Sequence, residues 1–219
     1  SPVGAALVNL TFSHSEIKDL LIAWAVLSVA FTIFFFRGPF RALASGAPSG
    51  AAVSALVVGL VVSSLTAGVG FLLHELAHKV VAVHYGQVAA FKADYSMLFL
   101  AVMSAVIGFL FAAPGAVYHR GFVTEREQGL IALAGPAVNV ALLVAFAPLY
   151  FLGGGIVAQI GALGLLINAI LAAFNMIPFG PLDGKKVLRW SKPVFVATAV
   201  PIIGLAALLL FGGVVGLSV

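Results

Sequence analysis

The chain has 219 residues, of which 63% are hydrophobic and only 8% are charged. Ordinary soluble domains carry about 25% charged residues, so this composition excludes a soluble globular protein and predicts an integral membrane protein. The chain has no cysteine, so disulfides and thiolate metal sites are excluded and any metal must be held by His, Asp or Glu. Its eleven basic residues, which give a net charge of +4, are spread thinly between apolar segments, which favours topology signals over a nucleic-acid surface.

Six apolar segments approach or exceed the length of about 20 residues that a helix needs to cross the hydrocarbon core. They lie at 20–36, 51–73, 97–117, 129–152, 156–179 and 194–219. The first is short and extends to 17–36 if Ile17 is included. No soluble domain fits between them. We therefore predict a single transmembrane domain over 1–219, with a core at about 51–190 and peripheral first and last spans at 17–36 and 194–219.

Two polar stretches, 83–95 and 117–128, interrupt this pattern. Both are rich in β-branched and aromatic residues and contain glycine, which is typical of short strands or hairpins. Irregular loops are the alternative.

The sequence HELAH at 74–78 directly follows the second apolar segment. On a helix, His74 and His78 lie on one face and can hold one metal ion. Glu75 is offset by about 100°, so it can reach an activated water without being a ligand. Zinc lowers the pKa of a bound water to about 7, and a nearby carboxylate can take its proton. A chance match is the alternative, but ionisable residues within a membrane are costly and indicate function.

Catalytic zinc usually has three protein ligands, so a third ligand is needed. His84 would give the histidine spacing of metzincin enzymes, but those enzymes turn at a glycine where this chain has Val81. Asp183 is the other candidate. It follows an apolar segment in which Pro178 and Pro181 prevent a regular helix. A solvated aspartate in an interfacial turn is the alternative for this residue.

Three motifs together resemble the site-2 protease family of intramembrane zinc metalloproteases. They are HELAH at 74–78, GPAVN at 135–139 and NMIPFGPLDG at 175–184. The resemblance covers about residues 51–190 and implies one zinc ion per chain, with Glu75 as the general base. The implied zinc ligands are His74, His78 and Asp183. The type implied is the prokaryotic or archaeal one that lacks PDZ-like and CBS domains.

The same resemblance implies that Asn139 and Asn175 bind the substrate strand or the developing oxyanion; interhelical hydrogen bonding is the alternative. It implies hydrolysis of a peptide bond within or near a transmembrane segment, as in regulated intramembrane proteolysis. The expected partners are membrane-spanning protein substrates, which would enter between the first and last spans, and the lipid bilayer; the oligomeric state stays open. A zinc transporter and a non-catalytic metal-binding membrane protein are the competing functions.

A shared zinc ion constrains the topology, because His78 and Asp183 must then lie at the same depth. This requires an even number of crossings between residues 83 and 183, yet three apolar segments lie there. One of them cannot span the membrane. We assign 97–117 as a re-entrant segment, because Ser104, Gly108 and the sequence AAPG at 112–115 interrupt it.

The predicted fold is an α-helical polytopic membrane protein with about five full transmembrane helices, a re-entrant segment, and short β-strands near the cytoplasmic face. Eight basic residues then fall on the side of the active site and two on the other side. If 97–117 crossed the membrane fully, the basic residues would be grouped differently but would again divide eight to two. Their distribution therefore does not distinguish the two topologies. We expect a multi-pass protein of the cell membrane whose active site faces the cytoplasm.

Overall fold

The computed structural model describes residues 10–46, 49–110 and 114–213. Within these ranges the chain is mostly helical and forms one two-stranded sheet. The elements are α1 His14–Phe35, α2 Arg37–Ala44, α3 Gly50–Ser63, the π-helical turn η1 Ser64–Gly68, α4 Val69–His84, β1 Val88–Ala93, α5 Tyr95–Ile107, β2 Gly115–Arg120, α6 Glu125–Leu152, α7 Gly155–Asn175, α8 Asp183–Trp190 and α9 Lys192–Phe211.

In the described part of the chain, five helices are long and apolar enough to cross a membrane. They are His14–Phe35, Gly50–His84, Glu125–Leu152, Gly155–Asn175 and Lys192–Phe211. Their number equals the predicted number of full spans, although crossing itself stays a prediction. The predicted last span continues to 219, and residues 214–219 lie outside the described ranges, as do 111–113 of the predicted re-entrant segment.

Helix α5 is the apolar helix that falls short of a span. Its 13 residues rise by about 20 Å, whereas the hydrocarbon core is about 30 Å thick. The strands on either side of α5 pair with each other in antiparallel register, from Val88 opposite Arg120 to Ala93 opposite Gly115. The chain therefore leaves the sheet at Ala93 and returns to the same place at Gly115. This is the path expected of a re-entrant segment, and its placement within a membrane stays a prediction.

The two strands lie in or close to the polar stretches for which strands were predicted. Strand β1 falls within 83–95, whereas β2 begins at Gly115, two residues before the predicted stretch, and ends at Arg120. The irregular-loop alternative is therefore wrong for the paired residues. The rest of the second stretch is the connection at 121–124 and the first turn of α6, which Thr124 caps by accepting a hydrogen bond from the Glu127 N–H.

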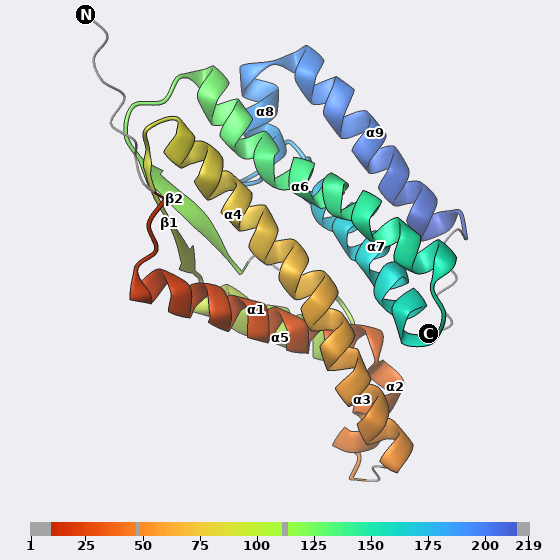
Figure 1. The fold of residues 1–219 in the computed structure, drawn as a ribbon. Helices are drawn as coiled ribbons and strands as arrows, with labels where there is room; N and C mark the ends of the chain where they lie inside the picture. Colours follow the sequence, from red (N-terminus) through yellow and green to blue (C-terminus); the bar gives the residue numbers. More distant parts are fainter. Residues whose placement is uncertain (1–9, 47–48, 111–113, 214–219) are drawn as a thin grey trace, which may run out of the picture.

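Helices α4, α6 and α7 form the centre of the molecule, with α1 and α5 packed on one side and α9 on the other (Figure 1). Helix α6 runs antiparallel to α4, and α7 returns in the direction of α4. The end of α4, the start of α6 and the segment after α7 consequently meet at one end of the molecule. This confirms the prediction that the helix carrying His78 and the helix preceding Asp183 run in the same direction.

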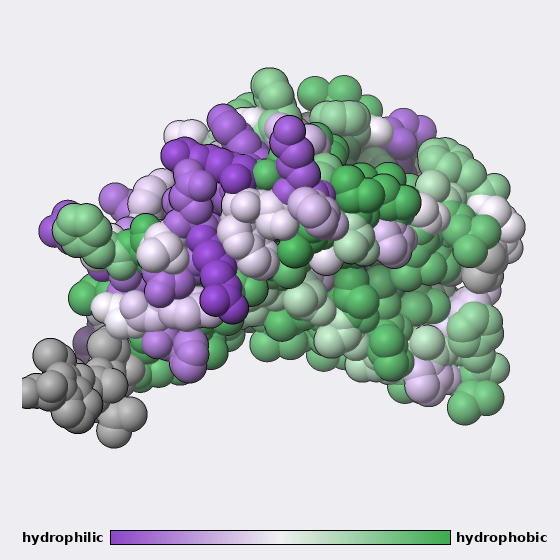
Figure 2. Space-filling model, turned by 90° about the horizontal axis from the view of Figure 1, so that it is seen from above, coloured by the Kyte–Doolittle hydropathy of each residue, from purple (hydrophilic) through white to green (hydrophobic). Residues whose placement is uncertain are grey.

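The surface near that end is polar. Figure 2, which views the molecule from above, shows hydrophilic residues gathered mainly on the left of this face, while hydrophobic residues dominate its right side. Large apolar side chains are exposed along the helices, including Val57, Val144 and Val200. An apolar flank of this kind is expected of a protein whose outer surface contacts lipid.

Candidate metal centre

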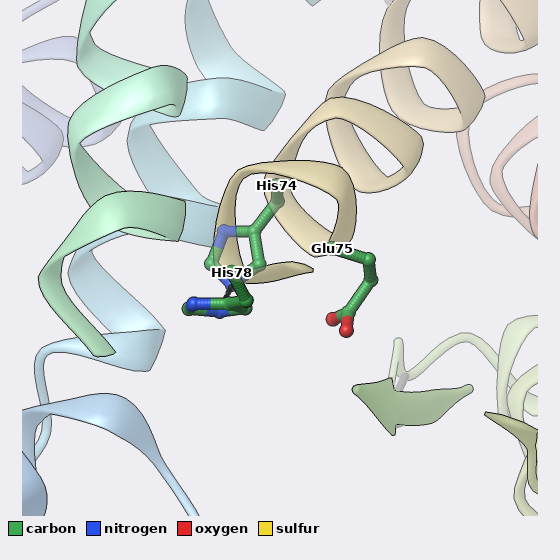
Figure 3. Close-up of side chains that lie close together, drawn as sticks. All are labelled: His74, Glu75 and His78. Carbon is green, nitrogen blue, oxygen red and sulfur yellow. Dashed lines mark hydrogen bonds between the residues drawn. The ribbon is translucent and has the colours of Figure 1, made fainter. Parts of the chain in front are cut away.

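Helix α4 carries His74, Glu75 and His78, and all three side chains are buried. The imidazole rings of the two histidines lie edge to face with centroids 4.6 Å apart. Figure 3 shows these rings close together, while the Glu75 side chain points away from them toward the sheet. One ligand atom from each of the three residues lies within 4.8 Å of those of the other two. The Glu75 carboxylate therefore lies near the two imidazole rings but does not point at the space between them.

Asp183 is the first residue of α8, and its side chain contacts both histidines. Gly184 makes this approach possible, because a Cβ atom there would lie 2.2 Å from the Met176 carbonyl oxygen at the end of α7. Burial raises the pKa of the Asp183 carboxyl, but the adjacent His78 and His74 imidazoles outweigh burial and hold the pKa below its usual value. Asp183 is thus a carboxylate at neutral pH.

The geometry of the three side chains fits a zinc ion. Zinc binds nitrogen and oxygen ligands at about 2.0–2.2 Å, which separates neighbouring ligand atoms by roughly 3.3 Å in a tetrahedron. The two histidine Nε2 atoms are 3.0 Å apart. Asp183 Oδ2 lies 3.3 Å from His74 Nε2 and 3.2 Å from His78 Nε2. His74 Nε2, His78 Nε2 and Asp183 Oδ2 are therefore spaced as three ligands of one metal ion would be; we call these three side chains the tripod.

The second nitrogen of each imidazole is held by a hydrogen bond. His78 Nδ1 lies 2.7 Å from the Ile131 carbonyl oxygen, and His74 Nδ1 lies 2.6 Å from Asn139 Oδ1. A carbonyl oxygen can only accept, so His78 carries its proton on Nδ1 and keeps the lone pair on Nε2. Ligating histidines in metal sites are oriented by partners of this kind.

Helix α6 approaches the site at Gly135, the first residue of the GPAVN motif. A Cβ atom at this position would lie 2.5 Å from His74 Nε2 and 2.6 Å from His78 Nε2. Any side chain here would occupy the space of the two ligand atoms. The glycine is therefore required by the site itself.

A cavity of about 160 Å³ opens beside the tripod. Its polar lining includes Glu75, His119, Asn175 and Lys186. Its apolar lining comes from α1, η1, α4 and α7, through Leu27, Phe31, Ala67, Phe71, Leu171 and Phe174. The metal centre thus sits in the wall of a pocket that continues between apolar helices.

The "Putative zinc metalloprotease MJ0611" of Methanocaldococcus jannaschii is 40% identical to this chain over 204 residues, which cover 91% of this chain and 97% of that protein. The chain belongs to this zinc metalloprotease family. A second member, "Putative zinc metalloprotease YwhC" of Bacillus subtilis, is 32% identical over 61% of this chain and 67% of its own length. A third, "Putative zinc metalloprotease sll0528" of Synechocystis, is 30% identical over 61% of this chain and 31% of its own.

No family model matches the chain. No solved structure matches it either.

The structure separates the two candidates for a third ligand. Asp183 lies against both histidines. His84 is the last residue of α4, partly exposed, and its ring contacts Tyr85 with centroids 5.2 Å apart. The tripod contains the residues that the family resemblance implied, and their role as zinc ligands stays a prediction.

The two predicted substrate-binding asparagines lie in different surroundings. Asn175 lines the cavity, and its Nδ2 donates to the Leu171 carbonyl oxygen at 3.0 Å. Asn139 is fully buried, does not line the cavity, and uses both amide atoms in hydrogen bonds to other helices. The position of Asn139 therefore favours the alternative, interhelical hydrogen bonding, and argues against the predicted contact with substrate.

Three residues at or behind the site were not predicted. Lys186 Nζ lies 3.6 Å from Asp183 Oδ1. His119 lines the cavity from β2, and burial, together with Lys186 and His78, lowers the pKa of its imidazole. Asn168 is fully buried behind Asn139. The sequence did contain a signal for Asn168. It is a polar residue in an apolar segment, and it lies seven positions before Asn175, which places both asparagines on the same helix face.

Proposed function

We propose that the protein is an intramembrane zinc metalloprotease of the site-2 type, which hydrolyses a peptide bond within or near a transmembrane segment of its substrates. The observation that carries this proposal is the buried tripod of His74, His78 and Asp183, with Glu75 beside it, in the wall of a cavity that extends between apolar helices. Membership of the zinc metalloprotease family supports the same reaction class.

His74, His78 and Asp183 would hold the zinc ion, which when bound supplies Lewis acidity toward the scissile carbonyl and toward a water molecule. Glu75 takes a proton from the attacking water as the oxygen adds to the carbonyl carbon. The C–N bond then breaks, and Glu75 passes that proton to the leaving nitrogen. The products are a carboxylic acid and an amine, or a carboxylate and an ammonium group once the second water proton has also moved to the amine, and water is the only co-substrate.

The substrate must present an extended backbone, because the carbonyl groups of an intact transmembrane helix are bonded within the helix. Strand β2 offers the edge for such a segment. The N–H groups of Phe91 and Ala93 in β1 point away from β2, toward the α1 carboxylates of Glu16 and Asp19, at 2.9 and 3.0 Å. The outer edge of β1 is therefore already covered.

The partners of those two β1 residues are Val117 and Gly115. In an antiparallel ladder such pairs turn their N–H and C=O groups outward on both strands. Val117 and Gly115 line the cavity, and the Val117 N–H hydrogen-bonds the Glu75 carboxylate. A substrate strand paired with β2 would thus lie beside the general base.

The cavity also suggests how the substrate enters. Its apolar walls include Leu27 and Phe31 of α1 and Leu171 and Phe174 of α7. Among the described residues, none of its lining belongs to α9. This favours a path between α1 and α7 over the path between the first and last spans that we expected from the sequence.

Replacement of Glu75 by Gln tests the proposed function. We expect the variant to retain zinc, because Glu75 is not a ligand, and to lose cleavage of a single-span substrate by about 10²–10⁴-fold, the contribution typical of a general base. Purified wild type and variant would be assayed for zinc content and for cleavage on the same samples.

Two further variants complete this experiment. Asp183→Ala should lose both zinc and cleavage, whereas the control His84→Ala should keep both. Cleavage at the wild-type rate by Glu75→Gln would contradict the mechanism, and zinc flux into liposomes without cleavage would favour a transporter.

A further inference from the structure

A chain of hydrogen bonds leads from the candidate metal centre into the helix bundle. Asn139 Oδ1 lies 2.6 Å from His74 Nδ1, and Asn139 Nδ2 donates to Asn168 Oδ1 at 2.8 Å. Asn168 Nδ2 donates to the Gly164 carbonyl oxygen at 2.9 Å. Asn139 and Asn168 are both fully buried. The chain thus connects α4, α6 and α7 at a depth where no solvent can replace a missing partner.

Backbone carbonyls fix the direction of every bond in this chain. The Gly164 oxygen can only accept, so Asn168 must turn its NH₂ group toward Gly164 and its Oδ1 toward Asn139. Asn139 must then donate through Nδ2, which also lies 3.3 Å from the Gly70 carbonyl oxygen. The atom left facing His74 is Asn139 Oδ1, an acceptor.

We propose that Asn168 is a positioning residue that sets the tautomer of His74 through Asn139. With Asn139 Oδ1 as the acceptor, His74 carries its proton on Nδ1, and Nε2 keeps the lone pair that faces Asp183 and His78. Asn168 itself touches neither substrate nor the tripod atoms. This inference rests on the proposed function, because the tautomer matters only if Nε2 is a metal ligand.

Loss of the Asn168 acceptor changes the balance between the two orientations of the Asn139 amide. Without it, the Asn139 NH₂ group in its present orientation keeps only the longer bond to the Gly70 carbonyl oxygen. The flipped orientation would present an NH₂ group to His74 and favour the proton on Nε2, where it blocks metal binding. The effect therefore appears in metal affinity, and not only in stability.

The experiment measures zinc affinity by competition with a chelator, together with the visible absorption of the Co²⁺-substituted protein. Partners of ligating histidines typically contribute 10–100-fold to metal affinity. We expect Asn139→Leu to weaken zinc binding within that range and Asn168→Leu to weaken it by about 10-fold. Thr32→Val is the matched control, because it removes a buried hydroxyl that donates to Ser28 at 2.7 Å, outside this chain.

Two additional variants make the result decisive. In the double variant, Asn168→Leu should add little to the loss caused by Asn139→Leu, because both act through one path. Asn168→Ser should weaken zinc binding like Asn168→Leu, since its short side chain can still donate to the carbonyl four residues earlier but cannot reach Asn139. Ser also keeps a polar residue at this position if Leu prevents folding.

Unchanged zinc affinity and an unchanged Co²⁺ spectrum in the Asn168 variants, with only a lower melting temperature, would overturn this inference and leave the proposed function standing. Simple additivity in the double variant would overturn it as well. Failure of the wild type itself to bind zinc would instead overturn the proposed function, and this inference with it.

Discussion

At the scale of single residues, two features define the site: both histidine Nδ1 atoms have hydrogen-bond partners, and the space beside both Nε2 atoms is too small for a side chain. The imidazoles of His78 and His74 are held at Nδ1 by Ile131 and Asn139, so both Nε2 atoms face Asp183. Gly135 supplies the room for those atoms. Preorganisation of this kind reduces the rearrangement needed for metal binding.

Gly135→Ala should abolish stoichiometric zinc binding and cleavage, because the added methyl group would lie 2.5 Å from His74 Nε2. Helix propensity favours alanine, so a loss cannot be attributed to the helix itself. The control is Gly204→Ala in α9, where a Cβ atom meets nothing within 4 Å. Zinc content after purification is the measurement. A Gly135→Ala protein with a full complement of zinc would contradict the geometry described for the tripod.

At the scale of secondary-structure elements, a buried ion pair fixes α1 to α4, the helix that carries His74, Glu75 and His78. Lys79, which follows His78 in α4, lies 2.6 Å from Glu16 Oε2 and also donates to the Thr11 carbonyl oxygen. Glu16 in turn accepts the Phe91 N–H of β1. One cluster therefore joins α1, α4 and the sheet, and it sets where the edge of β2 lies relative to Glu75.

Lys79→Met should destabilise the protein by about 3–5 kcal/mol, because it leaves the Glu16 carboxylate buried without its cation. Lys79 is 1% exposed and Glu16 is 3% exposed, so water cannot compensate. Thermal unfolding in detergent is the measurement, with Lys92→Met on the exposed face of β1 as the control. The double variant Glu16→Leu/Lys79→Met should recover part of the loss. Equal stability of Lys79→Met and wild type would show that the Lys79–Glu16 ion pair does not contribute to the stability of the fold.

At the scale of the whole molecule, the site requires α4 and α7 to end at the same side of the membrane. Helix α6 carries the chain away from that side and α7 brings it back, while the segment that contains α5 leaves the sheet after Ala93 and returns to it at Gly115. The tripod thus assembles from three segments that are distant in the sequence. The orientation that we predict, with the site toward the cytoplasm, would place the connection between α6 and α7 outside the cell.

Single cysteines test this topology, because the chain has none of its own. Gly154→Cys, between α6 and α7, should react with a membrane-impermeant maleimide in intact cells. Phe122→Cys, on the fully exposed connection between β2 and α6, should react only after the membrane is permeabilised. Labelling is read on a denaturing gel. Reaction of both positions from the same side would show that α6 does not cross, and the reverse pattern would place the site outside.

The sequence by itself determined the class of the protein and the chemistry of its centre. Apolar segments of spanning length follow from the thickness of the bilayer, and the spacing of HELAH places His74 and His78 on one helix face. The shared depth of His78 and Asp183 even predicted parallel helices. These predictions rest on segment lengths, on residue spacing within one helix and on the number of membrane crossings, none of which requires knowledge of how the helices pack.

Only the tertiary structure decided what surrounds that centre. It places Asn139 behind His74 instead of in the cavity, brings Asn168 and Lys79 into networks with distant helices, and pairs β1 with β2 across α5. Partners of this kind are separated by up to 75 residues in the sequence. Helix period and composition carry no information on which buried polar groups meet, because that depends on how the helices pack.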